Sequence, residues 1–300
     1  MERVLITGLT GRSGAYFLQQ LAAQPPEGMC FAAIVRPSSD TRALKECGLP
    51  IELRTGNLYD EAFVREATRG TDTLLHIAGT RKSWPLVRAA VENGAKRLIL
   101  VHTTGIFSKY QSAKADYLEI ERKIRELIAG RGVALTILRP TMIYGSANDG
   151  TIARFFGMAR RLPVFPLIGG GRYALQPVHQ SDLGRAYYQA LVHPKETAGR
   201  DYNLSGGTKI DFADLMREIC AVMGKKRLFV PVPLALAHTA AKLLRACSGG
   251  RVDYREKVLR MAEDRSFSHE QAAADFGYAP MELREGLRLE AEALRRAGKI

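Results

Sequence analysis

Cysteine is scarce in this chain, which has only four among its 300 residues. The four lie far apart, with neither a CxxC spacing nor neighbouring histidine pairs: Cys30, Cys47, Cys220 and Cys247. Such a pattern indicates neither a disulfide framework nor a zinc site, and it favours a reducing compartment. We therefore expect a protein without a metal centre.

Long apolar runs are lacking as well. The most apolar region covers residues 230–244, contains two prolines, a histidine and a lysine, and is shorter than the ~20 residues that span a bilayer. We interpret it as a helix. The first residues show no succession of basic, apolar and small residues of the kind that marks a signal peptide. The sequence thus predicts a cytoplasmic protein without a membrane span.

Acidic residues are in the minority, because 31 Asp and Glu stand against 44 Lys and Arg, for a net charge of +13. A basic surplus favours anionic ligands. The cations occur in short groups such as Lys225-Lys226-Arg227, and neither a long basic run nor an RNA-binding aromatic motif is present. We expect a small-molecule substrate, for which the charge favours an anion, and no nucleic acid. A homo-oligomer stays open.

Short β-branched runs alternate with helical patterns along the first half of the chain. Six strands are predicted, at residues 3–7, 30–35, 51–55, 73–77, 97–102 and 134–138. Helical periodicity occurs at residues 16–22, 61–68, 85–93 and 112–128. This alternation predicts the α/β class, with a doubly wound parallel sheet and crossover helices on its faces.

A glycine-rich turn lies between the first predicted strand and the first predicted helix. Its sequence is Thr7-Gly8-Leu9-Thr10-Gly11-Arg12-Ser13-Gly14. Glycines allow a tight turn, a close approach of a pyrophosphate and close packing of helix on strand, while the helix N-terminus attracts the anion. The turn therefore predicts dinucleotide binding, with contacts from Gly8, Thr10, Gly11, Arg12, Ser13 and Gly14.

The residue after the second strand bears on the choice of dinucleotide. Rossmann proteins that prefer NAD usually have a carboxylate there, which binds the ribose hydroxyls, whereas this chain has Arg36. Arg36, Arg12 and the hydroxyls of Ser38 and Ser39 suit a 2′-phosphate. The sequence favours NADP(H) over NAD(H). The alternative is that Arg36 is simply a solvated residue at a strand end.

The glycine spacing resembles that of short-chain dehydrogenase/reductase proteins. Further segments are similar to the extended and atypical branches of that family, at residues 56–60, 76–80, 136–145, 176–183, 202–207 and 276–287. Residues 166–178 resemble the atypical subgroup that includes the complex I accessory subunit of that fold, some of whose members bind cofactor without known turnover. The resemblance implies additional cofactor contacts from Asn57, Leu58, Ala78, Gly79 and Pro140.

The resemblance also implies a division into two parts. A Rossmann domain would cover residues 1–147 and 174–206, and a smaller, mostly helical C-terminal lobe would cover residues 148–173 and 207–300. In this family the C-terminal part folds over the cofactor, so we expect the substrate to bind between the two parts.

Family enzymes use a tyrosine and a lysine one helical turn apart, with a serine or threonine nearby. Tyr110 and Lys114 have this spacing, and residues 108–111 resemble a capping box that would place both on one helix face, near Thr103 or Thr104. The phenol would transfer a proton, while the ammonium would lower the phenol's pKa and bind the nicotinamide ribose.

Two features leave this catalytic pair open. Only residues 105–109 separate Thr104 from Tyr110, whereas extended relatives have a longer loop at this place. Counted back from Pro140, the lysine of most relatives falls near Leu118. Tyr117 and Glu121, farther along the same helix, are interpreted as helix-surface or domain-contact residues.

Two classes of function follow from the sequence. The first is an NADP(H)-dependent oxidoreductase, or an epimerase or dehydratase, acting on a small or nucleotide-linked carbonyl or alcohol. The second is a cofactor-binding protein without turnover, which serves as a sensor or as an assembly or scaffold component. The geometry around Tyr110 and Lys114 distinguishes the two.

Overall fold

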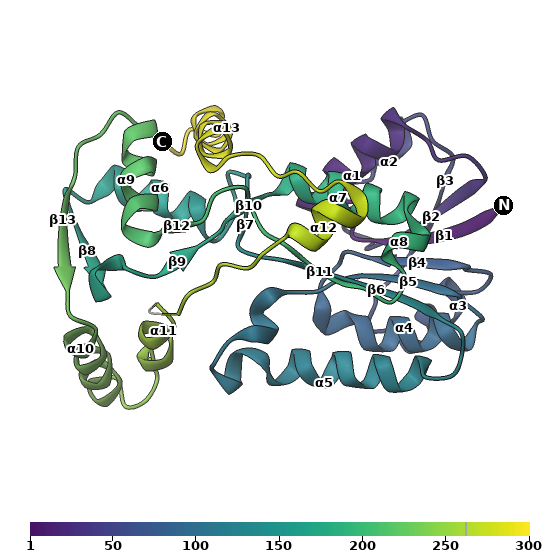
Figure 1. Cartoon of the computed structure of the whole chain (residues 1–300), viewed down its shortest axis with the longest axis horizontal. Helices are drawn as coiled ribbons and strands as arrows, with labels where there is room; N and C mark the ends of the chain where they lie inside the picture. The colour runs from purple at the N-terminus through teal and green to yellow at the C-terminus, as the bar shows by residue number, and fades with distance from the viewer. Residues whose placement is uncertain (262) are drawn as a thin grey trace.

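One parallel sheet forms the centre of the larger of two lobes (Figure 1). The computed structural model describes residues 1–261 and 263–300, apart from the side chains of residues 111–113 and 257. Within this part of the chain, seven strands pair in the order β11-β6-β5-β4-β1-β2-β3. They are β1 (Glu2–Thr7), β2 (Met29–Val35), β3 (Ile51–Thr55), β4 (Thr73–His76), β5 (Arg97–Val101), β6 (Ala134–Pro140) and β11 (Asp201–Leu204). The strand order changes direction between β1 and β4, which places a ligand crevice at the carboxyl ends of these two strands.

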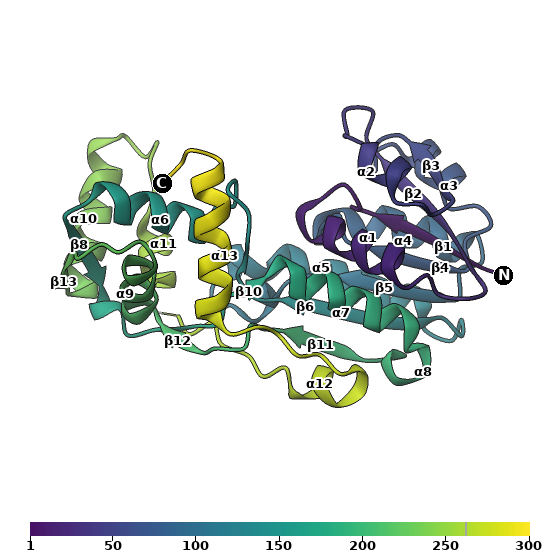
Figure 2. The same ribbon diagram turned by 90° about the horizontal axis from the view of Figure 1, so that it is seen from above.

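Helices cover both faces of the sheet (Figures 1 and 2). One face packs against α1 (Arg12–Ala23), α2 (Arg42–Glu46) and α7 (Gln180–Val192), and the other against α3 (Glu61–Ala67), α4 (Ser83–Glu92) and α5 (Gln111–Ile128). In β1, Val4 and Ile6 point into the core between the sheet and α1, α2 and α7. Leu5 points into the core on the opposite face of the sheet, against α3, α4 and α5. Such double burial is why the strands are almost continuously apolar.

Close contact between α1 and α7 depends on one glycine. A Cβ on Gly184 would lie 2.6 Å from the carbonyl carbon of Tyr16, so a larger residue would push the two helices apart. The contact holds α1, and the glycine-rich turn before it, firmly against the Rossmann core.

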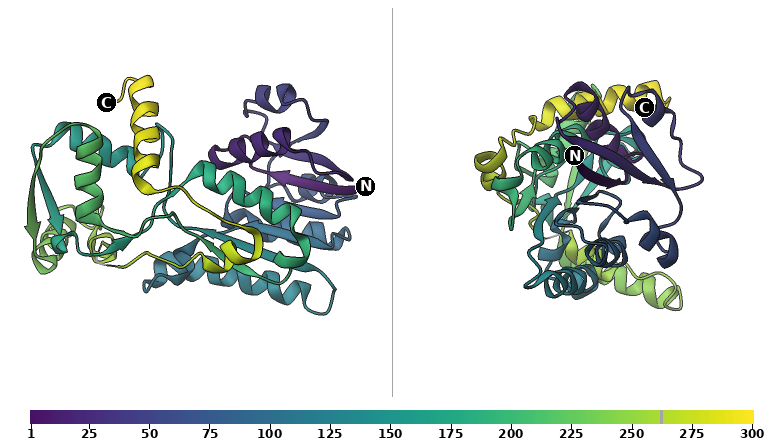
Figure 3. Two further views of the ribbon diagram at one scale, coloured as in Figure 1. Left: turned by 45° about the horizontal axis from the view of Figure 1, so that its top comes forward. Right: turned by 90° about the vertical axis from the view of Figure 1, so that its right-hand side faces the viewer.

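The smaller lobe has its own apolar core, which includes Phe156, Phe165, Phe212 and Leu287. Its helices are α6 (Ile152–Arg161), α9 (Phe212–Val222), α10 (Leu234–Cys247), α11 (Arg255–Arg260) and α13 (Leu283–Arg296). Strand β8 (Val164–Ile168) pairs with β13 (Leu228–Val232), and β9 (Ala174–Leu175) pairs with β12 (Ile210–Asp211). Figures 2 and 3 show α13 standing on the side of this lobe that faces the sheet.

Short elements join the lobes and complete the chain. They are the 3-10 turns η1 (Thr80–Lys82), η2 (Thr104–Phe107) and η3 (Gly169–Gly171), the paired strands β7 (Ile143–Tyr144) and β10 (Val178–His179), and the helices α8 (Pro194–Thr197) and α12 (Glu270–Phe276). Side chains of α12 pack into the core beside β11.

The structure confirms the predicted fold class and the six predicted strands, with small shifts at their ends. The interpretation of residues 230–244 as one helix is wrong at its start. This segment begins inside β13, and α10 starts only after Pro233, because prolines at 231 and 233 are compatible with extended backbone and not with a helix interior. None of the described helices is both long and apolar enough to cross a membrane.

Candidate functional site

The glycine-rich turn has the backbone geometry that a diphosphate requires. Gly8 ends β1 with a φ of +87°, a conformation that favours glycine, and its carbonyl accepts a hydrogen bond of 2.9 Å from the Gly11 amide. A Cβ on Gly14 would overlap the Gly8 carbonyl oxygen, so glycine is needed for the close packing of α1 on β1. The N-terminus of α1 therefore points into the crevice with its amides accessible.

Two cavities meet at this turn. The Arg36 cavity, of about 210 Å³, is lined by Gly8, Thr10, Gly11, Ile34, Val35, Arg36, Ser39, Gly56, Asn57, Leu58, Ala78 and Lys82. The Arg12 cavity, of about 330 Å³, is lined by Gly8, Gly11, Arg12, Ser13, Ile77, Ala78, Gly79, Ile143, Tyr144, Asp149 and Gln180. Because Gly8, Gly11 and Ala78 line both, the cavities form one bent crevice across the ends of β1 and β4.

Most of the predicted cofactor contacts lie in this crevice, while Gly14 and Pro140 lie behind it. Gly14 supports the turn, and the carbonyl of Pro140 accepts a 3.1 Å hydrogen bond from the Thr104 hydroxyl. The structure separates the two arginines that the sequence placed at one phosphate. Arg12 lines the other cavity, where its guanidinium donates to the Asn148 carbonyl at 2.5 Å.

A different cation lies beside Arg36. Lys82 lines the Arg36 cavity, and its ammonium stands 5.6 Å from the centre of the Tyr59 ring. No Asp or Glu occurs among the described residues that line this cavity. Sequence reasoning missed Lys82, because only the turn η1 after Gly79 places it in the lining of this cavity.

Asp149 and Gln180 line the Arg12 cavity, and Glu290 of α13 lies beside Asp149. Glu290 is fully buried, and its carboxyl group hydrogen-bonds to Asp149 and to the backbone of Gly145. Among the described residues, the buried Oε1 atom of Gln180 has no hydrogen-bond partner. Burial, and next the charge of Asp149, raise the pKa of Glu290 to about 8. Glu290 is thus a neutral acid at neutral pH.

The predicted catalytic residues lie around the start of α5. Tyr110 is the residue before the helix, with extended backbone, and α5 begins at Gln111. Among the described residues that line the two cavities, neither Tyr110 nor Lys114 is found. Thr103 accepts a 3.0 Å hydrogen bond from the Gly105 amide, so its hydroxyl oxygen caps η2.

Tyr110, not Ser108, is the N-cap residue of α5, and the Gln111 side chain of the predicted capping box lies outside the described residues. Ser108 donates its hydroxyl proton to a Glu263 carboxylate oxygen at 3.0 Å, and the second oxygen of Glu263 accepts from the Lys109 amide at 2.6 Å. The segment before Tyr110 is thereby held by the C-terminal lobe.

Tyr117 lies closer to the threonines than its interpretation as a surface residue implied. A Cβ on Gly105 would be 3.4 Å from the Tyr117 ring and 3.3 Å from the Thr103 hydroxyl oxygen. The guanidinium of Arg81 stands 5.4 Å from the centre of the Tyr117 ring. Arg81 follows Gly79, which lines the Arg12 cavity, by two residues.

Of the two alternatives for Glu121, a helix-surface or a domain-contact residue, the structure excludes the first, because Glu121 is buried. Glu121 is buried, accepts from Arg139 at 2.5 Å and bonds to His102 at 2.9 Å, while His102 contacts the Ser83 hydroxyl at 3.0 Å. Burial acts to raise the pKa of Glu121, but the hydrogen bonds from His102 and Arg139 leave it lowered. Strands β5 and β6 direct these two partners at α5, and a buried carboxylate requires such partners.

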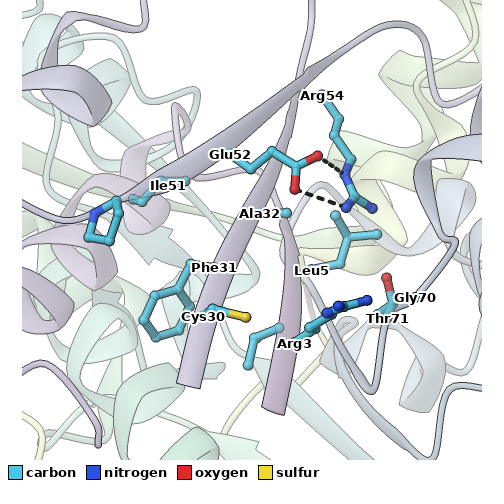
Figure 4. Close-up of a pocket in the computed structure, with 12 residues that line it drawn as sticks. Arg3, Leu5, Cys30, Phe31, Ala32, Ile51, Glu52, Arg54, Gly70 and Thr71 are labelled. Atoms are coloured by element: carbon cyan, nitrogen blue, oxygen red, sulfur yellow. Dashed lines mark hydrogen bonds and ion pairs between the residues drawn. The ribbon is translucent and has the colours of Figure 1, made fainter. Parts of the chain in front are cut away.

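Another cavity borders the sheet at the opposite ends of its strands. This basal cavity, of about 660 Å³, is lined by residues from the amino-terminal parts of β1, β2 and β3 and by Gly70 and Thr71 (Figure 4). Its polar wall includes Arg3 and the ion pair between Glu52 and Arg54, at 2.8 Å. We place the dinucleotide in the crevice instead, because ligands of open α/β sheets bind at the carboxyl ends of the strands.

Known proteins show the same fold. The family model described as NAD(P)H-binding matches residues 8–157. A ceramide reductase of Caulobacter vibrioides is 25% identical over 266 residues, which cover 82% of this chain and 78% of the relative. The mitochondrial NADH dehydrogenase [ubiquinone] 1 alpha subcomplex subunit 9 of Arabidopsis thaliana is 25% identical over 261 residues, covering 79% and 62%.

A solved structure is similar over the whole length. It is a nucleoside-diphosphate-sugar epimerase of Pseudomonas aeruginosa, with a TM-score of 0.77 and 20% identity, and the match covers 100% of this chain and 99% of the epimerase. The family model spans half of the chain and includes the glycine-rich turn and both cavities' strand ends. The chain therefore belongs to the NAD(P)H-binding family, with the fold of short-chain dehydrogenase/reductase proteins.

Proposed function

We propose that this protein binds NADP(H) in the crevice formed by the Arg36 and Arg12 cavities. The observation that carries the proposal is the pairing of Arg36 with Lys82 in a cavity whose described lining has no acid. An acid there would accept the ribose hydroxyls of NAD, whereas two cations and the Ser39 hydroxyl suit a 2′-phosphate. The amides at the start of α1 would hold the diphosphate.

The nicotinamide would then occupy the Arg12 cavity. Gly79, Ile143 and Tyr144 line it, and the unpartnered Oε1 atom of Gln180 offers an acceptor for a carboxamide N–H. This fit supports a cofactor with an amide at its reactive end. The bound group would supply hydride transfer.

We further propose that the protein is an oxidoreductase, or an epimerase or dehydratase, acting on a small or nucleotide-linked carbonyl or alcohol. The reductase and the epimerase among the similar proteins support this class. Tyr110 and Lys114 are the proposed catalytic pair, with Thr103 and Thr104 beside them. Tyr117 is a second candidate for the proton donor, because its ring lies against Gly105 beside Thr103 and Arg81.

A cofactor-binding role without turnover is the second candidate function. The observation that favours it is that neither Tyr110 nor Lys114 lines the crevice in the described structure. The similarity to a subunit of NADH dehydrogenase supports the same role as an assembly component.

Titration of the native protein with NADPH and NADH, followed by a panel of carbonyl substrates, tests the proposal. We expect NADPH to bind at least tenfold more tightly than NADH. Equal affinities would refute the NADP(H) assignment. NADPH binding without oxidation by any carbonyl in a broad panel would favour the binding role over the enzyme.

A further inference from the structure

An apolar stripe runs along the outer side of α10. Leu236 and Leu243 are 61% and 62% exposed, and Leu244 is 46% exposed. Their spacing of seven and eight residues places them on one side of the helix, together with the exposed Cys247. The opposite side of α10 contains the buried Ala241 and packs against α11. The stripe therefore faces away from the lobe.

The outer face of the neighbouring strand is apolar too. Leu228 and Val230 of β13 are 61% and 40% exposed, and Val164 of the paired strand β8 is also exposed. Strand β13 leads directly into α10, and Figures 1 and 2 show both elements at the end of the molecule farthest from β3. We call β13, α10 and their outward side chains the distal surface. A monomeric protein rarely exposes so many large aliphatic residues together.

The distal surface is strongly basic. Residues 223–252 contain six Lys and Arg and no Asp or Glu. Lys225 and Lys226 precede β13, and Lys242 lies within α10; all three are exposed. Arg245 of α10 forms an ion pair, of 3.3 Å, with Asp253. The distal surface thus combines an apolar stripe with a local excess of positive charge.

We propose that the distal surface docks on an anionic phospholipid membrane, with α10 lying in the plane of the interface. A helix of 14 residues, about 21 Å long, is suited to this orientation, with leucines entering the acyl boundary and lysines contacting the headgroups. Anionic lipids attract basic segments of this kind.

The chemistry of the surface distinguishes this occupant from the alternatives. A second copy of the chain would bring two basic surfaces together, and their charges would repel. A specific protein partner would use aromatic anchors and directional polar contacts, whereas the outward stripe consists of aliphatic side chains that make no directional contacts. Docking at this end leaves the crevice at Gly8 open to cofactor.

Vesicle co-sedimentation of the full-length protein tests the proposal. We expect binding to vesicles of equal parts phosphatidylglycerol and phosphatidylcholine to be at least tenfold stronger than to phosphatidylcholine alone. Raising NaCl from about 0.05 M to about 0.5 M should weaken it, because the Debye length shortens from over 10 Å to a few ångströms. Equal binding to both vesicles would overturn the proposal.

Matched variants locate the binding surface. The double variant Leu236→Gln/Leu243→Gln should reduce partitioning to anionic vesicles about tenfold or more, whereas Leu289→Gln on α13, which is 42% exposed, should leave it unchanged. Thermal unfolding and NADPH affinity of each variant verify the fold. Unchanged vesicle binding by the double variant would overturn the proposal. So would a native dimer in light scattering that the double variant converts to a monomer, because the surface would then belong to a second copy.

Discussion

Glu290 of α13 places its buried carboxyl group against the carboxylate of Asp149, in the segment between β7 and α6. A proton on Glu290 allows the two acids to hydrogen-bond instead of repelling each other, and two buried carboxylates in contact would be costly. The same segment presents the Asn148 carbonyl to Arg12 at the glycine-rich turn. The C-terminal helix is therefore coupled to the cofactor crevice through a protonated acid.

We expect stability to fall as pH rises through this proton's titration. The pKa of Glu290 is raised from an ordinary 4.5 to about 8, so between these values the folded protein binds one more proton than the unfolded chain. The free energy of unfolding should decrease by roughly 2–3 kcal/mol between about pH 5.5 and pH 8. Arg12 opposes the shift and Tyr144 lies nearby. Denaturant unfolding at a series of pH values measures the loss.

The Glu290→Gln variant is the control for that titration. Gln keeps the shape of the neutral acid and cannot ionise, so the decrease in stability toward pH 8 should disappear. Asp182, whose pKa burial raises to about 6, contributes at the lower end of the range and is unchanged in the variant. An identical pH dependence in both proteins would show that Glu290 does not carry the proton.

Arg36→Asp should weaken NADPH binding by about tenfold, or ~1.4 kcal/mol, because the 2′-phosphate would lose a cation in an exposed corner and meet a like charge. NADH affinity should hold or improve. Isothermal titration with both cofactors measures the change. Arg131→Asp, at another exposed arginine, makes the same change in net charge and should alter neither affinity. If both variants lost the same NADPH affinity, the change in net charge would explain the loss, and Arg36 would not contact the 2′-phosphate.

Gly11→Val should abolish dinucleotide binding. Gly11 lines both cavities, and a Cβ there would already lie 2.9 Å from the Gly8 carbonyl oxygen, so the branched side chain must enter the space of the diphosphate. Gly157→Ala is the control, because a Cβ at this helical glycine meets nothing within 4 Å. Circular dichroism of both variants checks the fold. NADPH binding by the valine variant would place the ligand elsewhere.

Tyr110→Phe should lower kcat by ~10²–10⁴-fold, if a substrate from the carbonyl panel is turned over, because the ring stays while its transferable proton is lost. NADPH affinity should scarcely change. Lys114→Ala should reduce both turnover and cofactor affinity, since the ammonium would be lost from the phenol and the ribose. Normal turnover by Tyr110→Phe together with a large loss in Tyr117→Phe would transfer the proton-donor role to Tyr117.

Glu121→Gln should destabilise the fold by roughly 3–5 kcal/mol, because Arg139 would keep its charge in a buried place with one partner fewer. Glu126→Gln on the same helix is the matched control. Its partner Arg122 is exposed, so the loss should be at most about 0.5 kcal/mol. Urea denaturation compares them. Similar small losses in both variants would mean that water reaches the Glu121 network.

The sequence by itself determined the central sheet and the position of the glycine-rich turn. Runs such as Val4 to Ile6 are buried on both faces, so their composition alone reports the strand. The turn is largely local as well, because a Cβ on Gly11 or Gly14 would meet the Gly8 carbonyl oxygen, and Gly8 itself has a positive φ. Patterns of this kind can be recognised in the sequence without knowledge of distant contacts.

Only the tertiary structure decided which distant side chains meet. Ser108 bonds to Glu263, which lies in the other lobe, and Glu121 has buried partners because His102 and Arg139 reach it from two neighbouring strand ends. The contact between Glu290 and Asp149 has no signature in either segment. A buried charge or proton is set by the solvent that the fold excludes and by the partners that it brings close, and neither exists until the chain has packed.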